Sequence, residues 1–226
     1  MSTPLNPAQR EAIRYLDGPC LVLAGAGSGK TRVITHKIAH LIDSGFKPSA
    51  IGAITFTNKA AQEMQERLGA LVRLPERERP LVSTFHSLGV QIVRSEARAL
   101  GLKPSFSILD ADDALGIVQQ ALATTDRKLL RAAQSRISLW KNALIEPPQA
   151  LAQAADAQDQ AVALAYRDYA ATLSAYQAVD FDDLIRLPVR LLREDATAAQ
   201  RWRERLRYLL VDEYQDTNAC QYELLK

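Results

Sequence analysis

The chain has 226 residues, enough for one large domain or two small ones with a buried core. Hydrophobic residues make up 47% and charged residues 24%, which excludes disordered, collagen-like and disulfide-scaffold proteins. The net charge of +2 is uninformative, but the first 100 residues carry 13 Lys and Arg against 8 Asp and Glu, which weakly favours a polyanionic partner.

The sequence indicates neither a membrane segment nor a metal-binding cysteine motif. No apolar run approaches the roughly 18 residues that span a bilayer, and the N-terminus lacks the apolar core of a signal peptide. We therefore expect a cytoplasmic protein without a membrane partner. Cys20 and Cys220 belong to no zinc-type cluster, and Cys20, at the start of an apolar run, is expected to be buried.

Strands and helices alternate in the first part of the chain. Asn6 is positioned to cap a first helix, with Pro7 in its first turn. Short apolar runs predict buried strands at 20–24, 51–56 and 81–85, and a helix is predicted after each: around 33–42, over 59–72, and up to about residue 100. This order predicts an α/β fold, with a parallel sheet covered by helices on both faces.

An all-helical insertion is predicted in the second half. Almost no strand signal occurs between residue 110 and about residue 200, and Pro147 and Pro148 are expected to break the helical series. Helices are predicted at 111–123, 127–144, 149–157, 159–178 and 181–193. The apolar run at 208–213 then predicts a return to the sheet. We expect α/β structure in 1–108, the insertion in 109–200, and continued α/β structure in 201–226.

The sequence AGAGSGKT at 24–31 has the pattern of a phosphate-binding loop between a strand and a helix. Glycines let backbone N–H groups curl around a phosphate, and the helix N-terminus adds positive potential. We expect Lys30 to bridge the β- and γ-phosphates of a bound nucleotide and the Thr31 hydroxyl to bind Mg²⁺. The alternative is a structural glycine turn. The other predicted nucleotide-contacting residues of this loop are Ala24, Gly25, Ala26, Gly27, Ser28 and Gly29.

The second chemical signal is VDEYQD at 211–216, an acidic pair at the end of a predicted strand. In a doubly wound sheet, such acids point into the ligand crevice. We expect Asp212 to hold Mg²⁺ and Glu213 to orient and deprotonate the attacking water. The alternative is a capped, solvated strand end. Asp212 follows Lys30 by 182 residues, far more than a βαβ unit needs, and the helical insertion accounts for the excess.

Six segments in chain order carry a family resemblance: LNPAQREAI (5–13), AGAGSGKTRVIT (24–35), AITFTNKAAQEM (53–64), STFHSLG (83–89), DFDDLI (180–185) and LLVDEYQDTN (209–218). Over nearly its whole length the chain resembles the N-terminal part of Rep/UvrD-type superfamily 1 DNA helicases. The resemblance implies a P-loop RecA-like domain 1A, begun in 1–108 and resumed in 201–226, interrupted by a helical subdomain 1B.

The resemblance also implies roles for residues that the pattern alone would leave unassigned. Gln9 would read the adenine edge, and Arg32 would lie near the nucleotide. Without the resemblance, both would be taken for solvated helix residues. Single-stranded DNA would contact two segments: Phe56, Thr57 and Asn58, and then Thr84, Phe85 and His86. Without the resemblance, both segments would be interpreted as ordinary strand ends that carry core aromatic residues and a structural histidine.

Two further features are interpreted structurally. Trp140 could contact DNA, but packing between insertion helices is the preferred interpretation. Asp180, Asp182 and Asp183 look like a metal cluster, yet their spacing at a helix start favours capping and interaction with the helix dipole.

The implied function is that of an ATP-dependent 3′→5′ helicase and translocase associated with the nucleoid. It would act on single-stranded DNA and single-strand/double-strand junctions, with replication or repair proteins as candidate partners. The family's motif III and second RecA-like domain have no match in 1–226, so we expect these residues alone to bind Mg-ATP and DNA weakly, without unwinding, and to leave a sheet edge exposed. Alternatives are another P-loop NTPase, such as a small kinase, or a truncated non-enzymatic module that binds ATP and DNA.

Overall fold

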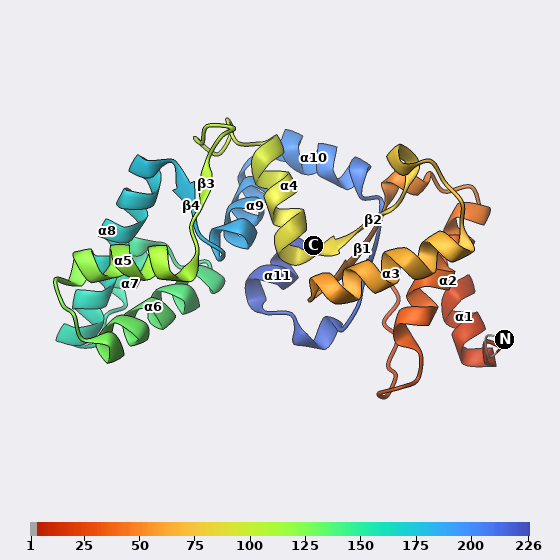
Figure 1. Ribbon diagram of the computed structural model, residues 1–226, viewed down its shortest axis with the longest axis horizontal. Coiled ribbons are helices and arrows are strands. Elements are labelled where there is room, and N and C mark those ends of the chain that lie inside the picture. The colour runs from red at the N-terminus through yellow and green to blue at the C-terminus, as the bar shows by residue number, and fades with distance from the viewer. Residues whose placement is uncertain (1–3) are drawn as a thin grey trace. The chain divides into compact units, whose positions relative to one another are not determined.

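The computed structural model describes residues 4–226, which divide into two compact units (Figure 1). The sheet unit comprises the chain up to Phe85 together with Gln200–Asp216. The helical unit comprises His86–Ala199 together with Thr217–Lys226. Among residues 4–226, no helix is both long enough and apolar enough to cross a membrane.

Three parallel strands form the main sheet of the described chain, in the order β2–β1–β5. They are β1 (Ile51–Thr55), β2 (Leu81–Thr84) and β5 (Tyr208–Val211). All five residues of β1 are buried, as expected for the central strand of a sheet covered on both faces. In the β1–β5 pair Ile54 lies opposite Val211, and the Asp212 N–H continues the ladder by donating to the Ile54 carbonyl at 2.8 Å.

Helices pack on both faces of this sheet, which confirms the predicted α/β class. The helices α1 (Pro7–Arg14), α2 (Lys30–Asp43) and α3 (Asn58–Leu71) belong to the sheet unit. Ile38 of α2 and Met64 of α3 are fully buried in a core with Ile51 and Ala53 of β1. On the opposite face of β1, a Cβ added to Gly52 would lie 3.1 Å from Leu206, directly after α10 (Ala196–Arg205).

Three short 3₁₀ turns complete the described part of this unit. They are η1 (Pro48–Ala50), directly before β1, η2 (Glu76–Glu78), in the charged loop before β2, and η3 (Tyr214–Asp216), directly after the acidic pair.

The strand predicted at 20–24 does not form. In the described structure these residues lie outside every strand and are exposed, with Leu23 88% accessible. Cys20 is likewise exposed, contrary to the expectation of burial. Among the strands of residues 4–226, β5 pairs with β1 alone, so its other edge is open. An apolar run shows that a segment gains from burial, but ladder hydrogen bonds require a partner edge that the local sequence does not identify.

The helical unit is built from α4 (Phe85–Ser95), α5 (Ala111–Leu122), α6 (Arg127–Asn142), α7 (Pro147–Ala152), α8 (Ala157–Tyr176), α9 (Asp183–Glu194) and α11 (Ala219–Leu224). Trp140 is buried and stacks on Tyr166 with ring centroids 5.9 Å apart, which confirms its packing role.

Three details of residues 107–205 differ from the sequence prediction. Pro147 and Pro148 occupy the first turn of α7 and so begin a helix, where their missing N–H groups cost nothing. The helix α10 was not predicted. Two-residue strands β3 (Ser107–Ile108) and β4 (Ala178–Val179) pair in parallel, and such short strands leave little sequence signal.

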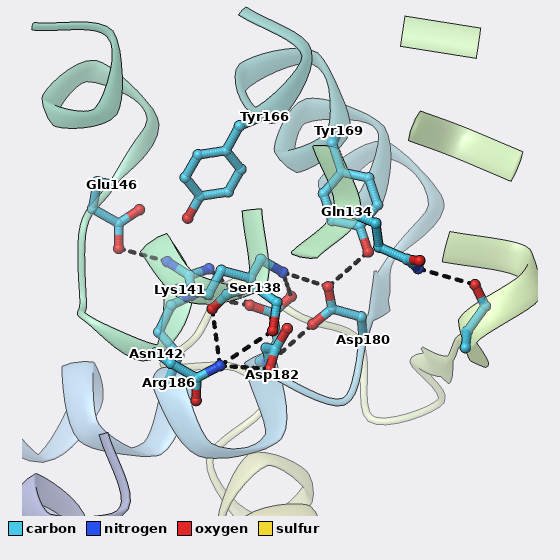
Figure 2. A network of polar contacts seen from close by, with 12 residues as sticks. Gln134, Ser138, Lys141, Asn142, Glu146, Tyr166, Tyr169, Asp180, Asp182 and Arg186 are labelled. Carbon is cyan, nitrogen blue, oxygen red and sulfur yellow. Dashed lines mark hydrogen bonds and ion pairs between the residues drawn. The ribbon is translucent and has the colours of Figure 1, made fainter. Parts of the chain in front are cut away.

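A buried network of ion pairs and hydrogen bonds joins three helices of the helical unit (Figure 2). Lys141 of α6, 1% exposed, donates to Asp180 at 2.6 Å and lies 3.0 Å from Asp183 of α9. Asp180 also accepts a hydrogen bond from the Tyr169 hydroxyl of α8, at 2.6 Å, and from the Asp183 backbone N–H at the start of α9. Asp180 thus accepts the first N–H of α9, as the capping interpretation expects, whereas Asp182, the N-cap residue itself, makes no side-chain capping hydrogen bond. The charge network itself was not predicted.

The close approach of α4 to α9 yields a stability prediction. A Cβ added to Gly89 would lie 1.8 Å from the Leu184 carbonyl oxygen, a backbone atom that cannot move away cheaply. Gly89→Ala should therefore destabilise the helical unit by about 3 kcal/mol through overpacking. In the matched control Gly116→Ala, within α5, the new Cβ meets no atom of the described chain within 4 Å.

The control should gain roughly 0.5–1 kcal/mol because alanine favours the helix interior. Urea unfolding followed by circular dichroism measures both changes. Equal stabilities of the two variants would contradict the close contact.

Candidate nucleotide and nucleic-acid site

The Gly-rich segment before α2 forms an exposed loop whose backbone suits an anion. Gly27 and Gly29 have φ values of 71° and 85°, in the left-handed region that favours glycine. The Ser28 N–H donates to the Gly25 carbonyl at 3.3 Å, which closes the turn. Gly29 is the N-cap residue of α2 and, because it has no side chain, makes no side-chain capping hydrogen bond. First-turn N–H groups of α2 therefore face the loop, the arrangement by which helix N-termini bind phosphates.

The acidic pair after β5 meets this loop inside the sheet unit. The Thr31 hydroxyl donates to Asp212 Oδ2 at 3.2 Å, and Lys30 Nζ lies 3.6 Å from Glu213 Oε1. Asp212 is 5% exposed, whereas Lys30 and Glu213 are partly accessible. The two motifs, 182 residues apart in the chain, thus form one cluster of a cation, a hydroxyl and two carboxylates.

Glu213 is held in an unusual conformation with its carboxylate ionised. Its φ of 52° is uncommon for a residue with a side chain. The Gln215 amide donates to Glu213 Oε2 at 2.6 Å, and this hydrogen bond is the main cause that lowers the pKa of Glu213, with Lys30 adding to it. Glu213 therefore carries its charge well below neutral pH, in the form that accepts a proton.

Gln9 of α1 contacts the loop directly. Its Nε2 donates to the Ser28 carbonyl at 2.9 Å, and its Oε1 accepts the Asn6 N–H at 2.9 Å within a capping box. An amide has two N–H donors and two oxygen lone pairs, so one of each remains for a ligand. Arg32 is partly buried in the first turn of α2, beside Thr31.

The first predicted DNA segment follows β1. Thr57 caps α3 by accepting the Ala60 N–H at 3.1 Å, and Thr57 and Asn58 are both exposed. Phe56 is partly exposed. These three residues follow the strand next to β5, so they leave the same edge of the sheet as Asp212 and Glu213.

Phe85 does not offer a stacking surface, contrary to the sequence expectation. It is 1% exposed, and its ring centroid lies 5.4 Å from that of Phe56. Thr84 is also buried, at the end of β2. Because burial makes both faces of the Phe85 ring inaccessible to a base, Phe85 can only support Phe56 by packing against it.

In the helical unit, His86 lies beside an aromatic residue that the sequence analysis did not select. The Phe181 ring is 53% exposed and meets the His86 ring edge-on, with centroids 6.0 Å apart. Burial lowers the pKa of His86, and the nearby Asp182 only partly opposes this, so the imidazole is neutral at neutral pH. Phe181 lies within the DFDDLI segment, and its exposed ring beside His86 was not visible in sequence.

The family profile for "UvrD/REP helicase N-terminal domain" matches residues 5–226, and the chain belongs to this family. It is 50% identical to the ATP-dependent DNA helicase Rep of Escherichia coli K12 over 98% of this chain and 34% of that protein. It shares 43% identity with the ATP-dependent DNA helicase PcrA of Bacillus subtilis 168, over 98% of this chain and 31% of that protein. The chain thus spans about a third of these relatives.

The contact between Gln215 and Glu213 yields a pKa prediction. Removing the amide donor with Gln215→Ala should raise the pKa of Glu213 toward its ordinary value, because the ionised form loses its main stabilising hydrogen bond. NMR titration of ¹³C-labelled glutamates, with Glu213→Gln to assign the signal, measures the shift. The control Gln62→Ala removes a similar amide contact to Glu66 on α3 and should leave Glu213 unchanged. An unaltered Glu213 titration in Gln215→Ala would show that the amide has no such role.

Proposed function

We propose that this chain is the nucleotide- and DNA-binding N-terminal part of an ATP-dependent 3′→5′ DNA helicase. The observation that carries the proposal is the meeting of Lys30 and Thr31 with Glu213 and Asp212 in one cluster. Because the chain spans a third of its relatives, unwinding is proposed for the whole protein, and the nucleotide and DNA contacts for these residues.

We assign the sheet unit to a P-loop RecA-like fold. Its parallel strands, the loop before α2 and the acids after β5 support this assignment. Residues 1–108 and 201–226 would form domain 1A, and residues 109–200 the helical subdomain 1B. On these bounds α4 and α11, which cluster with the helical unit, would belong to domain 1A.

The residues present suit Mg²⁺ bound with ATP. The Thr31 hydroxyl and the Asp212 carboxylate, 3.2 Å apart, are the hard oxygen donors that this ion prefers. When bound, Mg²⁺ supplies charge neutralisation on the phosphates. Lys30 would leave Glu213 for the β- and γ-phosphates, while the remaining N–H and lone pair of Gln9 would contact the adenine edge, with Arg32 nearby.

Glu213 is assigned as the general base. Its lowered pKa keeps the carboxylate ready to accept a proton from water at neutral pH. As Lys30 engages the γ-phosphate, the Glu213 oxygen that it contacted becomes available to orient that water for in-line attack.

The proposed DNA contacts are Phe56, Thr57 and Asn58 in the sheet unit and His86 with Phe181 in the helical unit. Exposed aromatic rings offer stacking surfaces for bases, and the Thr and Asn side chains reach phosphates or sugars. We further propose action at single-strand/double-strand junctions on the nucleoid, together with replication or repair proteins.

The nucleotide assignment predicts that Lys30→Ala weakens binding of a fluorescent ATP analogue by about tenfold or more, as expected when a charged contact to phosphate is lost. Fluorescence anisotropy measures the affinity. Lys103→Ala, an exposed lysine of the helical unit, is the control and should bind normally. Full binding by Lys30→Ala would rule out the phosphate site.

The DNA assignment predicts that Phe56→Ala and Phe181→Ala each weaken binding of labelled oligo-dT by about 5- to 150-fold, since one stacked base contributes about 1–3 kcal/mol. Tyr176→Ala removes a ring of the helical unit that is 66% exposed and outside the proposed interface, so its affinity should not change. Equal affinities for all three variants would remove the stacking assignments.

A further inference from the structure

Lys37 is a buried cation that the proposed chemistry does not use. It lies on α2 two turns after Lys30, on the same face as Val33 and Leu41, where the helix pattern calls for an apolar residue. Its side chain is nevertheless only 6% exposed, and burial lowers its pKa. A charge in such a place requires partners, because an unpaired buried cation is strongly destabilising.

The partners of Lys37 are the free carbonyl groups at the end of α1. Its Nζ donates to the Ala12 carbonyl at 2.9 Å and to the Tyr15 carbonyl, and it faces the Tyr208 ring with 5.7 Å to the centroid. The last carbonyls of a helix lack partners within the helix and carry partial negative charge. Lys37 therefore fastens the C-terminal end of α1 to α2 and to the first residue of β5.

The N-terminal end of α1 carries Gln9, which donates to the Ser28 carbonyl of the phosphate loop. With eight residues, α1 is too short to be stable without tertiary contacts. Its two ends are thus tied to the same segment of chain, the loop by Gln9 and α2 by Lys37. A shift of the C-terminal end would move Gln9 with it, since a helix moves as a rigid body.

We propose that Lys37 is a positioning residue for the nucleotide base: it fixes α1 so that Gln9 stays at the phosphate loop and can select adenine. The inference rests on the proposed role of Gln9. It assigns base selectivity to a contact at the C-terminal end of α1, the end opposite Gln9, through the carbonyl groups of Ala12 and Tyr15.

The test compares ATP with inorganic tripolyphosphate, which has the phosphates but no base. Both compete with a fluorescent ATP analogue for the chain. Lys37→Met should reduce the preference for ATP over tripolyphosphate roughly two- to tenfold, the effect of losing one hydrogen bond to the base. Tripolyphosphate affinity should stay unchanged, because Lys30 and the loop remain. Lys37→Arg, which keeps a charged donor, should restore most of the preference.

Lys47→Met is the matched control, an exposed lysine shortly after α2, and should leave both affinities unaltered. If thermal unfolding shows that Lys37→Met does not fold, Lys37→Gln, which keeps a neutral donor, serves for the same comparison. An unchanged preference in the folded variant, or an equal loss of both affinities, would overturn the positioning role.

Gln9→Ala separates this inference from the function on which it rests. An unchanged preference in Gln9→Ala would refute the adenine contact itself. A reduced preference there, without one in the folded Lys37 variant, would refute only the positioning role. If the adenine contact and the positioning role both hold, the double variant Gln9→Ala/Lys37→Met should lose no more of its preference for ATP over tripolyphosphate than Gln9→Ala does. The reason is that both substitutions remove the same Gln9 contact to the base.

Discussion

The parallel pairing of β5 with β1 is the constraint on which the candidate site depends. The hydrogen bond from the Asp212 N–H to the Ile54 carbonyl extends this ladder by one residue and fixes the position of the acidic pair at the carboxyl end of the sheet. From that position Asp212 contacts Thr31 and Glu213 contacts Lys30. The neighbouring strand β1 continues into Phe56, Thr57 and Asn58, so the proposed nucleotide and DNA contacts leave adjacent strands at one edge of one sheet.

Both units contain a buried lysine that joins separate helices. Lys37 ties α1 to α2 in the sheet unit, and Lys141 ties α6 to Asp180 and to Asp183 of α9 in the helical unit. Apolar side chains could fill the same volume, but apolar packing is non-directional. An ammonium group with two oxygen partners fixes distance and angle together. We infer that these lysines contribute to the precise placement of helices more than to overall stability.

The candidate site was largely predictable because most of its residues lie in short motifs that can be recognised in the sequence. The glycine pattern with Lys30 and Thr31, and the acids after an apolar run, each carry their own signal, as does Asn6 as the cap of the first helix. Exposure was not predictable in this way. Phe85 and Phe181 are both aromatic residues next to chemically interesting segments, yet one is 1% and the other 53% exposed. Only the packing of distant segments distinguishes them.

The sequence by itself determined the helices other than α10, the strands β1, β2 and β5, the phosphate-loop pattern and the family, since these depend on periodicity, capping and short motifs within a few residues. Tertiary structure alone decided that residues 20–24 stay outside the sheet, that Lys37 and Lys141 are buried with oxygen partners, and that Glu213 forms a direct ion pair with Lys30. Each of these outcomes depends on groups that are far apart in the chain and become neighbours only on folding. No local pattern encodes such distances, because the free energy of a buried contact belongs to the pair and not to either residue.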